Sequence, residues 1–235
     1  MVNSYVAVDL ETTGLSPKEN KIIEIGAIKV IDGEVAGSFE TFVNPRVAIS
    51  SRITELTGIT DEMVQGAPYE KEAVESFIEF CGDNLLLGHN VRFDYSFLKV
   101  AATNSKIGFE YVCIDTLRIA RVVLPELPSK SLDRLTTHFQ LMHDNKHRAL
   151  SDAQAASLLY QKLYQEYYQG NEKCFEPVKY DMKFKRESAI TPKQIKYLSD
   201  LCKRYDLNLG VEIEGLTKNA ASRMIDRIRS QYGYN

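Results

Sequence analysis

Residues 5–14 read Tyr5-Val6-Ala7-Val8-Asp9-Leu10-Glu11-Thr12-Thr13-Gly14 and place two acidic residues inside an otherwise apolar, strand-like segment. Side chains alternate across a strand, so Asp9 and Glu11 project from the same face. Neighbouring carboxylates repel each other, and partly desolvated anions are costly unless a cation compensates them. A divalent metal is the simplest such cation. The alternative is an exposed strand end with two solvated acids, and the rest of the chain decides between the two.

The composition is that of an ordinary soluble protein: the chain has 235 residues, of which 44% are hydrophobic and 26% charged. This length suits one sizeable domain, or one domain with a small appendage. No apolar run approaches the roughly 18 residues of a membrane span, and the N-terminus lacks a signal pattern. The four cysteines are scattered, as in reduced cytosolic proteins. We therefore expect a cytoplasmic protein with no membrane partner.

The charge is distributed unevenly along the chain. Residues 1–170 carry a net charge of -7, whereas residues 171–235 carry +4. An acidic body is compatible with metal binding, and a basic end is compatible with a polyanionic partner. A modest positive excess is also typical of an ordinary solvated surface.

Hydrophobic periodicity predicts alternating strands and helices over residues 1–170, the expected catalytic domain. Strands are expected at 6–10, 22–31, 37–43, 85–88 and 112–115, with a hairpin turn at Asp32-Gly33. A short helix is expected to begin at residue 60. Further helices are expected at 69–81, 89–102, 116–123, 131–139 and 151–168. Three antiparallel strands followed by strand–helix alternation predict an α/β domain with a mixed central sheet flanked by helices.

The pattern changes after residue 170. Residues 171–190 have no periodicity and are expected to form a linker, partly strand-like or packed on the body. Residues 191–235 predict a small helical module, with Thr191-Pro192 as the start of a first helix that reaches residue 205. A second helix is expected from residue 218 to 229.

Three further residues add to the acidic pair. Asp94 is expected in the first turns of a helix that follows a buried strand, and Asp152 opens a long amphipathic helix. His147 stands five residues before Asp152, where a turn can direct it toward the same cleft. Each has an ordinary alternative, because acids near helix N-termini often only complement the helix dipole.

Together these segments resemble the DEDDh 3′→5′ exonucleases of the DnaQ-like, ribonuclease-H-like superfamily, which includes proofreading exonucleases of bacterial DNA polymerases. The resemblance covers about residues 4–165 and is closest to the DNA polymerase III epsilon and PolC-type members. Its motifs are Asp9-Leu10-Glu11-Thr12-Thr13-Gly14-Leu15, His89-Asn90-x-x-Phe93-Asp94 and His147-x-x-x-x-Asp152-Ala153, with further likeness in Ile23-Glu24-Ile25-Gly26-Ala27, residues 56–63 and Ile114-Asp115-Thr116. It implies a ribonuclease-H-like fold.

The resemblance also implies a site and a mechanism. Two divalent cations, Mg²⁺ or Mn²⁺, would be held by four carboxylates: Asp9, Glu11, Asp94 and Asp152. His147 would be the general base that deprotonates the attacking water, a task suited to imidazole near neutral pH. Two such ions activate the water and neutralise both the phosphate and the leaving oxygen.

Substrate contacts follow from the same resemblance. The residues expected to meet the terminal nucleotide are Thr12, Thr13, Gly14, Leu15, His89 and Phe93. Leu15 corresponds to an apolar wedge beside the last base. Phe93 either lines the nucleotide pocket or belongs to the hydrophobic core. Seven basic residues of the C-terminal module either contact phosphates or form a solvated helical face: Lys193, Lys196, Lys203, Arg204, Arg223, Arg227 and Arg229.

The sequence thus predicts a metal-dependent 3′→5′ exonuclease that releases nucleoside monophosphates from DNA 3′ ends, in proofreading or repair. The expected substrate is nucleic acid with a free 3′ end, with single-stranded DNA favoured. An exoribonuclease is one alternative, because the same chemistry cuts RNA. Another is a proofreading or tethering subunit that acts by binding a DNA polymerase. A catalytically silent nucleic-acid-binding module is disfavoured, because all five acid and imidazole positions are present.

Overall fold

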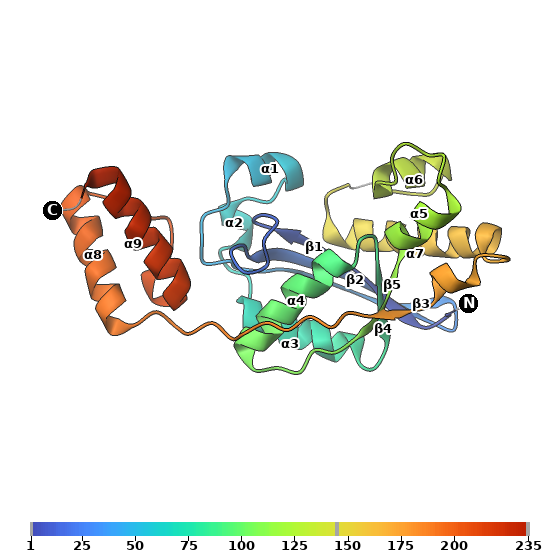
Figure 1. Ribbon diagram of the computed structural model, residues 1–235, viewed down its shortest axis with the longest axis horizontal. Coiled ribbons are helices and arrows are strands. Elements are labelled where there is room, and N and C mark those ends of the chain that lie inside the picture. Colours follow the sequence, from blue (N-terminus) through green and yellow to red (C-terminus); the bar gives the residue numbers. More distant parts are fainter. Residues whose placement is uncertain (1, 144–145, 234–235) are drawn as a thin grey trace.

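The computed structural model describes residues 2–143 and 146–233. Within them a six-stranded mixed sheet has the order β3-β2-β1-β4-β5-β6 (Figure 1). Its strands are β1 (Tyr5–Thr12), β2 (Ile22–Ile31), β3 (Glu34–Phe42), β4 (Leu85–Gly88), β5 (Val112–Asp115) and β6 (Val178–Lys179). β1, β4 and β5 run parallel, and β2, β3 and β6 are antiparallel to their neighbours.

Helices cover both faces of this sheet. Those of the body are α1 (Ser51–Thr57), α2 (Asp61–Val64), α3 (Glu70–Cys81), α4 (Arg92–Ser105), α5 (Thr116–Val123), α6 (Leu132–His138) and α7 (Ala149–Tyr167). None of the helices in the described part of the chain is long and apolar enough to cross a membrane.

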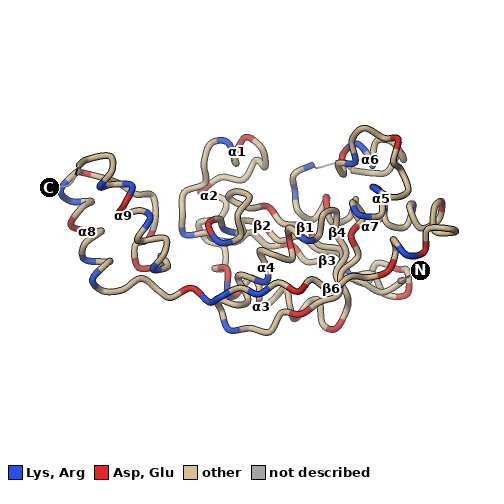
Figure 2. The backbone as a smooth tube through the Cα atoms, viewed as in Figure 1, with Lys and Arg blue, Asp and Glu red and all other residues tan. Residues whose placement is uncertain are grey.

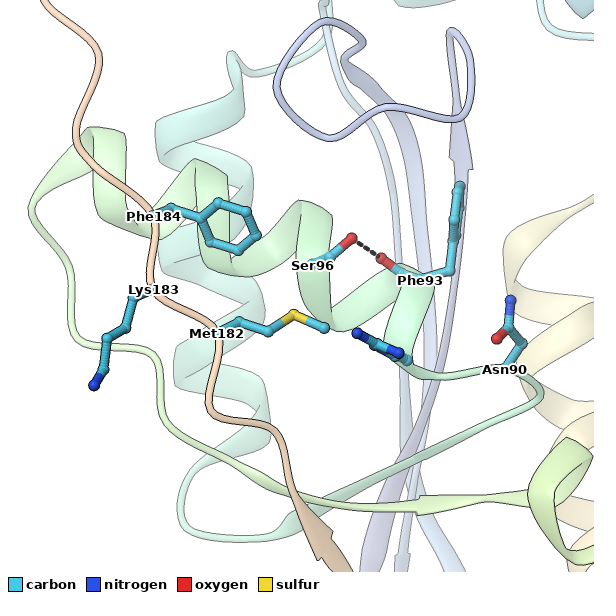
Figure 3. Close-up of a pocket in the computed structure, with 7 residues that line it drawn as sticks. Asn90, Phe93, Ser96, Met182, Lys183 and Phe184 are labelled. Carbon is cyan, nitrogen blue, oxygen red and sulfur yellow. Dashed lines mark hydrogen bonds between the residues drawn. The ribbon is translucent and has the colours of Figure 1, made fainter.

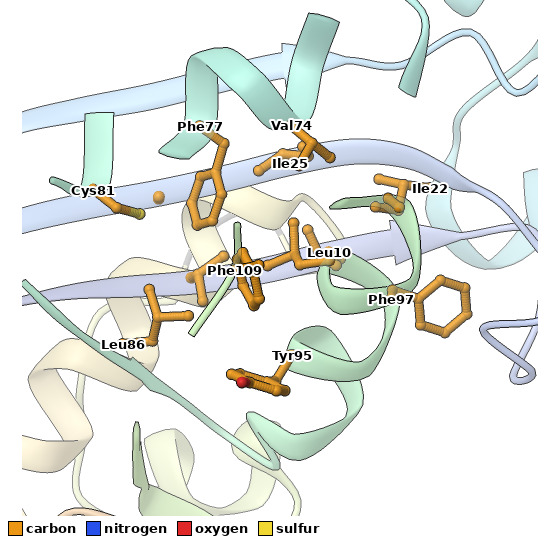
Figure 4. Close-up of a cluster of buried hydrophobic side chains, with 14 of the residues drawn as sticks. Leu10, Ile22, Ile25, Val74, Phe77, Cys81, Leu86, Tyr95, Phe97 and Phe109 are labelled. Atoms are coloured by element: carbon orange, nitrogen blue, oxygen red, sulfur yellow. The ribbon is translucent and has the colours of Figure 1, made fainter. Parts of the chain in front are cut away.

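β1 is the centre of the fold because its two faces belong to two different cores. Val6 and Val8 pack with α3 and α4 in one core, part of which Figure 4 shows. Tyr5 and Ala7 pack with α5 and α7 in the other. The odd-numbered positions of β1 therefore face α7, and the two acids of this strand are odd-numbered.

The strand and helix pattern expected from the sequence is confirmed, with shifted boundaries. β1 extends to Thr12, so both acids lie inside the strand, and α7 begins at Ala149, two residues earlier than expected. Helix α1 is absent from the expected pattern. It ends at Gly58, whose φ of 73° is the left-handed cap that glycine adopts without strain.

The first part of the expected linker belongs to the body. A 3-10 turn, η1 (Glu172–Phe175), buries the ring of Phe175 in the core beside α7. β6 then adds an edge strand to the sheet by pairing with β5. Residues 180–187 continue without regular structure along α4 toward the C-terminal helices (Figure 1).

The C-terminal helices form a small unit with a core of their own. Its elements are α8 (Pro192–Tyr205), η2 (Ile213–Gly215) and α9 (Lys218–Tyr232). Leu198 and Ile225 are buried between the helices, and Thr191 caps α8 together with Gln194. Figure 2 shows Lys and Arg spread along both helices and the segment before them.

Candidate active site

Four carboxylates from three separate segments meet at one edge of the sheet. Asp9 and Glu11 lie at the carboxyl end of β1, Asp94 in the first turn of α4, and Asp152 in the first turn of α7. α4 follows β4, the parallel neighbour of β1, so its first turn lies at the same edge. The backbone N–H of Leu10 donates to Asp94 Oδ1 at 3.1 Å, which ties α4 to β1 between the two acids.

The imidazole expected to act as the base lies beside this group. Glu11, His147 and Asp152 each offer one ligand atom, and these three atoms lie within 4.8 Å of one another. His147 is exposed and has a positive φ of 61°, an uncommon backbone conformation for a residue other than glycine. The folded chain therefore brings all five predicted acid and imidazole positions to one place.

The carboxylates disfavour one another's ionisation. Burial raises the pKa of Asp9 well above its usual value, and the charges of Asp94, Asp152 and Glu11 raise it further. Burial, followed by the charges of Asp152 and Glu24, raises the pKa of Glu11 to about 8. Burial also raises the pKa values of Asp94 and Asp152. The cluster thus carries more negative charge than its surroundings compensate.

This donor set fits hard divalent cations. Carboxylate oxygens are the ligands that Mg²⁺ and Mn²⁺ prefer in proteins. Arg148 is the nearby cation that lowers the pKa of Glu11, but its guanidinium is already bound to Glu24. A bound cation pair would supply the missing positive charge.

An ion pair that the local sequence pattern does not reveal holds the start of α7 against the sheet. Glu24 is fully buried in β2, and its Oε1 accepts hydrogen bonds from Arg148 Nε at 3.0 Å and Nη2 at 2.7 Å. Its Oε2 accepts from the backbone N–H of Ala149 at 2.9 Å. The sequence holds a signal, a single acid within the apolar run Ile22-Ile23-Glu24-Ile25, but gives no indication of its partner.

The backbones of β2 and α7 also touch directly. A Cβ added to Gly26 would lie 2.0 Å from the backbone nitrogen of Leu150 and 2.2 Å from the carbonyl carbon of Ala149. Only glycine permits this approach. The positions of His147 and Asp152 thus depend on β2, which carries none of the five predicted residues.

A second histidine, absent from the predicted site, also contacts one of its carboxylates. Nε2 of His143 is hydrogen bonded to Asp152 Oδ1, and its Nδ1 lies 3.3 Å from the hydroxyl of Thr136. The ring is almost fully buried, whereas His147 is exposed. The sequence signal for His143 is that two histidines, His143 and His147, stand within the ten residues before Asp152. The motif that resembles the DEDDh family selects His147 of the two.

The last residue of β1 and the loop that follows it contain four of the predicted substrate contacts. The Thr12 hydroxyl donates to the carbonyl of Gly14 at 2.7 Å, and Thr13 exchanges hydrogen bonds with the backbone of Lys21. The loop is therefore held in one shape. It presents Leu15 with 85% of its surface exposed, as an apolar wedge requires.

The two remaining predicted contacts differ from each other. Both ring nitrogens of His89 are engaged within the protein, Nδ1 with the Thr116 hydroxyl at 2.9 Å and Nε2 with the Lys130 carbonyl at 2.8 Å. Only the ring face of His89 remains for a nucleotide. Phe93 packs against Phe97, with ring centroids 4.9 Å apart, and it also lines an open cavity (Figure 3).

The family model described as an exonuclease of the RNase T type matches residues 6–160. Among curated relatives, the PolC-type DNA polymerase III of Clostridium perfringens is 43% identical over 155 residues, which is 66% of this chain and 11% of that protein. The PolC-type enzyme of Bacillus subtilis is 40% identical over 163 residues, which is 68% of this chain and 11% of that protein. This chain thus corresponds to a small part of those polymerases.

Solved structures share the fold. E. coli exonuclease I in complex with a dA16 oligonucleotide has a TM-score of 0.64 at 19% identity, covering 73% of this chain and 42% of that one. Exonuclease X in complex with 5′ overhanging duplex DNA has a TM-score of 0.57 at 24% identity, covering 73% of this chain and 97% of that one. The chain therefore belongs to the exonuclease family, and its mixed sheet flanked by helices is the ribonuclease-H-like fold of these enzymes.

Proposed function

We propose that this protein is a metal-dependent 3′→5′ exonuclease that releases nucleoside monophosphates from DNA 3′ ends, with single-stranded DNA as the favoured substrate. The observation that carries the proposal is the convergence of four carboxylates from β1, α4 and α7 with raised pKa values. Family membership supports nuclease chemistry, and the DEDDh pattern of residues supports the polarity.

Asp9, Glu11, Asp94 and Asp152 would hold two divalent ions, Mg²⁺ or Mn²⁺. When bound, such a pair activates water and neutralises charge on the phosphate and on the leaving 3′-oxygen. His147, close to Glu11 and Asp152, accepts the proton of the attacking water at a ring nitrogen. Leu15 and the loop before it orient the terminal nucleotide, so that its phosphate lies over the acidic cluster.

The test uses DNA and RNA oligonucleotides labelled at either end, with Mg²⁺, Mn²⁺ or a chelator. The proposal expects 5′-labelled DNA to shorten stepwise from its 3′ end with either metal, and no cleavage in the chelator. Stepwise shortening of 3′-labelled DNA from its 5′ end would contradict the polarity. A strong preference for RNA would favour the exoribonuclease alternative instead.

A polymerase partner is a second proposal, favoured by the similarity to one segment of PolC-type DNA polymerase III. In those proteins the matching segment is part of the polymerase chain, whereas here it is followed by α8 and α9. Pull-down of a replicative polymerase with the Asp9→Ala variant tests this role without cleavage. Recovery of no polymerase from native extract would argue for an enzyme that works alone.

A further inference from the structure

A segment that we call the strap, residues 180–187, runs along α4, whose first turn carries Asp94 (Figure 3). It is held at both ends. The Tyr180 hydroxyl donates to Asp115 Oδ2 at 3.4 Å, and the backbone N–H of Glu187 donates to Asn104 Oδ1 at 3.0 Å. Hydrogen bonds therefore attach both ends of the strap to the body, and the strap lies beyond residues 6–160, which match the exonuclease family.

An open groove of about 500 Å³ lies between the strap and α4. Arg92, Phe93 and Ser96 line it from α4, and Met182, Lys183 and Phe184 line it from the strap. Phe93 directly precedes Asp94, so the groove and the acidic cluster share the first turn of α4.

The charged side chains that line the groove are positive, in contrast to those of the acidic cluster. Arg92 and Lys183 are exposed cations, and no carboxylate is among the described residues that line the groove. The Lys183 side chain extends from the strap on the side away from α4 (Figure 3). Lys183 Nζ lies 3.7 Å from Asp181 Oδ2, but both side chains are more than 80% exposed. Such a surface pair contributes little, so Lys183 stays available to another anion.

Aromatic and apolar side chains stand between these cations. Phe184 and Met182 are half-buried and point toward α4 (Figure 3). The loop after β1 adds a third cation, because Lys18 Nζ lies 5.9 Å from the centroid of the Phe184 ring. Positive charge that follows a backbone, together with rings on which bases stack, is the combination that binds single-stranded nucleic acid.

We propose that this groove binds the nucleotides upstream of the scissile phosphate. Bases stack on Phe184 and contact Met182, while phosphates pair with Arg92 in the groove and with Lys183 on the outer side of the strap. The inference rests on the proposed exonuclease function, and it assigns to the strap the task of holding the single strand. The positive charge suits any anionic chain. The ring of Phe184 favours a nucleic acid over an acidic protein segment, because free bases can stack on its aromatic face.

The first experiment uses the absence of tryptophan from the chain. Phe184→Trp, made in the Asp9→Ala background to keep the oligonucleotide intact, places a single reporter in the groove. We expect its fluorescence to be quenched on titration with an oligothymidylate of about ten nucleotides, because bases stack on aromatic rings. The matched control, which should not respond, is Tyr168→Trp just after α7, at the opposite end of that helix from Asp152. DNA binding measured by anisotropy without a change at Phe184→Trp would overturn the proposal.

The second experiment separates this groove from the catalytic centre. Combined Lys183→Ala and Phe184→Ala should weaken oligothymidylate binding about 5- to 100-fold and lower the salt slope by about 0.7. Hydrolysis of the p-nitrophenyl ester of thymidine 5′-monophosphate, which has no upstream nucleotide, should stay unchanged. Lys185→Ala, the same charge change outside the groove, is the control.

The two hypotheses fail in different ways. A wild-type chain that cleaves, together with a double variant that binds DNA as wild type does, would overturn the groove alone. A wild-type chain that binds oligothymidylate through the groove but never cleaves it would overturn the exonuclease function alone. A chain that neither cleaves nor binds would overturn both.

Discussion

The carboxylate of Glu24 and the guanidinium of Arg148, 124 residues apart in the chain, form an ion pair that holds the start of α7 against the sheet. Two guanidinium nitrogens donate to the same carboxylate oxygen. Glu24 is fully buried, whereas 35% of the Arg148 side chain is exposed. The residue before Arg148 is the proposed base, and Asp152 lies four residues after it. The ion pair therefore links the stability of the fold to the geometry of the candidate active site.

Arg148→Ala should leave the Glu24 carboxylate buried without its ion-pair partner. We expect a loss of about 2–3 kcal/mol in the free energy of unfolding, below the range for a fully buried pair because Arg148 is partly exposed. Exonuclease turnover should fall as well. Urea unfolding measures the first effect, and Glu40→Gln is the control, because Glu40 makes only an exposed contact with Arg148 at 3.4 Å. Equal losses in the two variants would contradict the anchoring role.

Gly26→Ala should displace α7, because the backbone of Leu150 occupies the space that the new Cβ needs. We expect destabilisation of about 1–3 kcal/mol or more, with reduced metal affinity. Gly37→Ala in β3 is the matched control, since its Cβ would meet no atom closer than 3.8 Å. Thermal unfolding of both variants checks this, and a Gly26→Ala protein as stable as the control would refute it.

His147→Ala should lower turnover by about 10²- to 10⁴-fold, the usual contribution of a general base, while DNA affinity is retained. His143→Ala should have the smaller effect on turnover, because His143 contacts the protein through both ring nitrogens. His138→Ala, on the exposed side of α6, is the control. Single-turnover cleavage ranks the three, and a larger loss for His143→Ala would transfer the role of base to that residue.

The metal-free protein should become less stable as the pH rises. The folded-state pKa of Glu11 is raised from an ordinary 4.5 to about 8, so the native state binds more protons than the unfolded state in that window. The free energy of unfolding is therefore highest below this window and falls as the pH rises through it. Mg²⁺ should reverse the trend, because ligand carboxylates release protons on binding. Thermal unfolding from about pH 5 to pH 8, with chelator or Mg²⁺, tests the sign, and Glu11→Gln should make the metal-free slope shallower.

Truncation after Glu187 removes α8 and α9 but retains the strap. If the basic residues of the C-terminal helices neutralise phosphates, affinity for longer DNA should fall. The salt slope should then decrease by about 0.7 for each phosphate that these residues neutralise. Hydrolysis of a mononucleotide ester should not change. An unchanged affinity and salt slope would assign those residues to a solvated surface.

Much of the fold and of the candidate site followed from local patterns in the sequence. Alternation within β1 places Asp9 and Glu11 on one face, and helical periodicity places Asp94 and Asp152 in first turns. Such patterns depend on residues a few positions apart, so the sequence is sufficient to detect them. That is why the mixed α/β sheet was predictable, whereas the convergence of the four acids was implied by the resemblance of their motifs to the DEDDh exonucleases.

Tertiary structure alone decided what surrounds that centre. The pairing of Glu24 with Arg148, the contact of His143 with Asp152, and the strap over α4 join segments that are not neighbours in local structure. No local period records such contacts, because they depend on how the helices pack on the sheet. The sequence determined which groups are proposed to carry the chemistry, and packing decided how they are held and where the proposed groove lies.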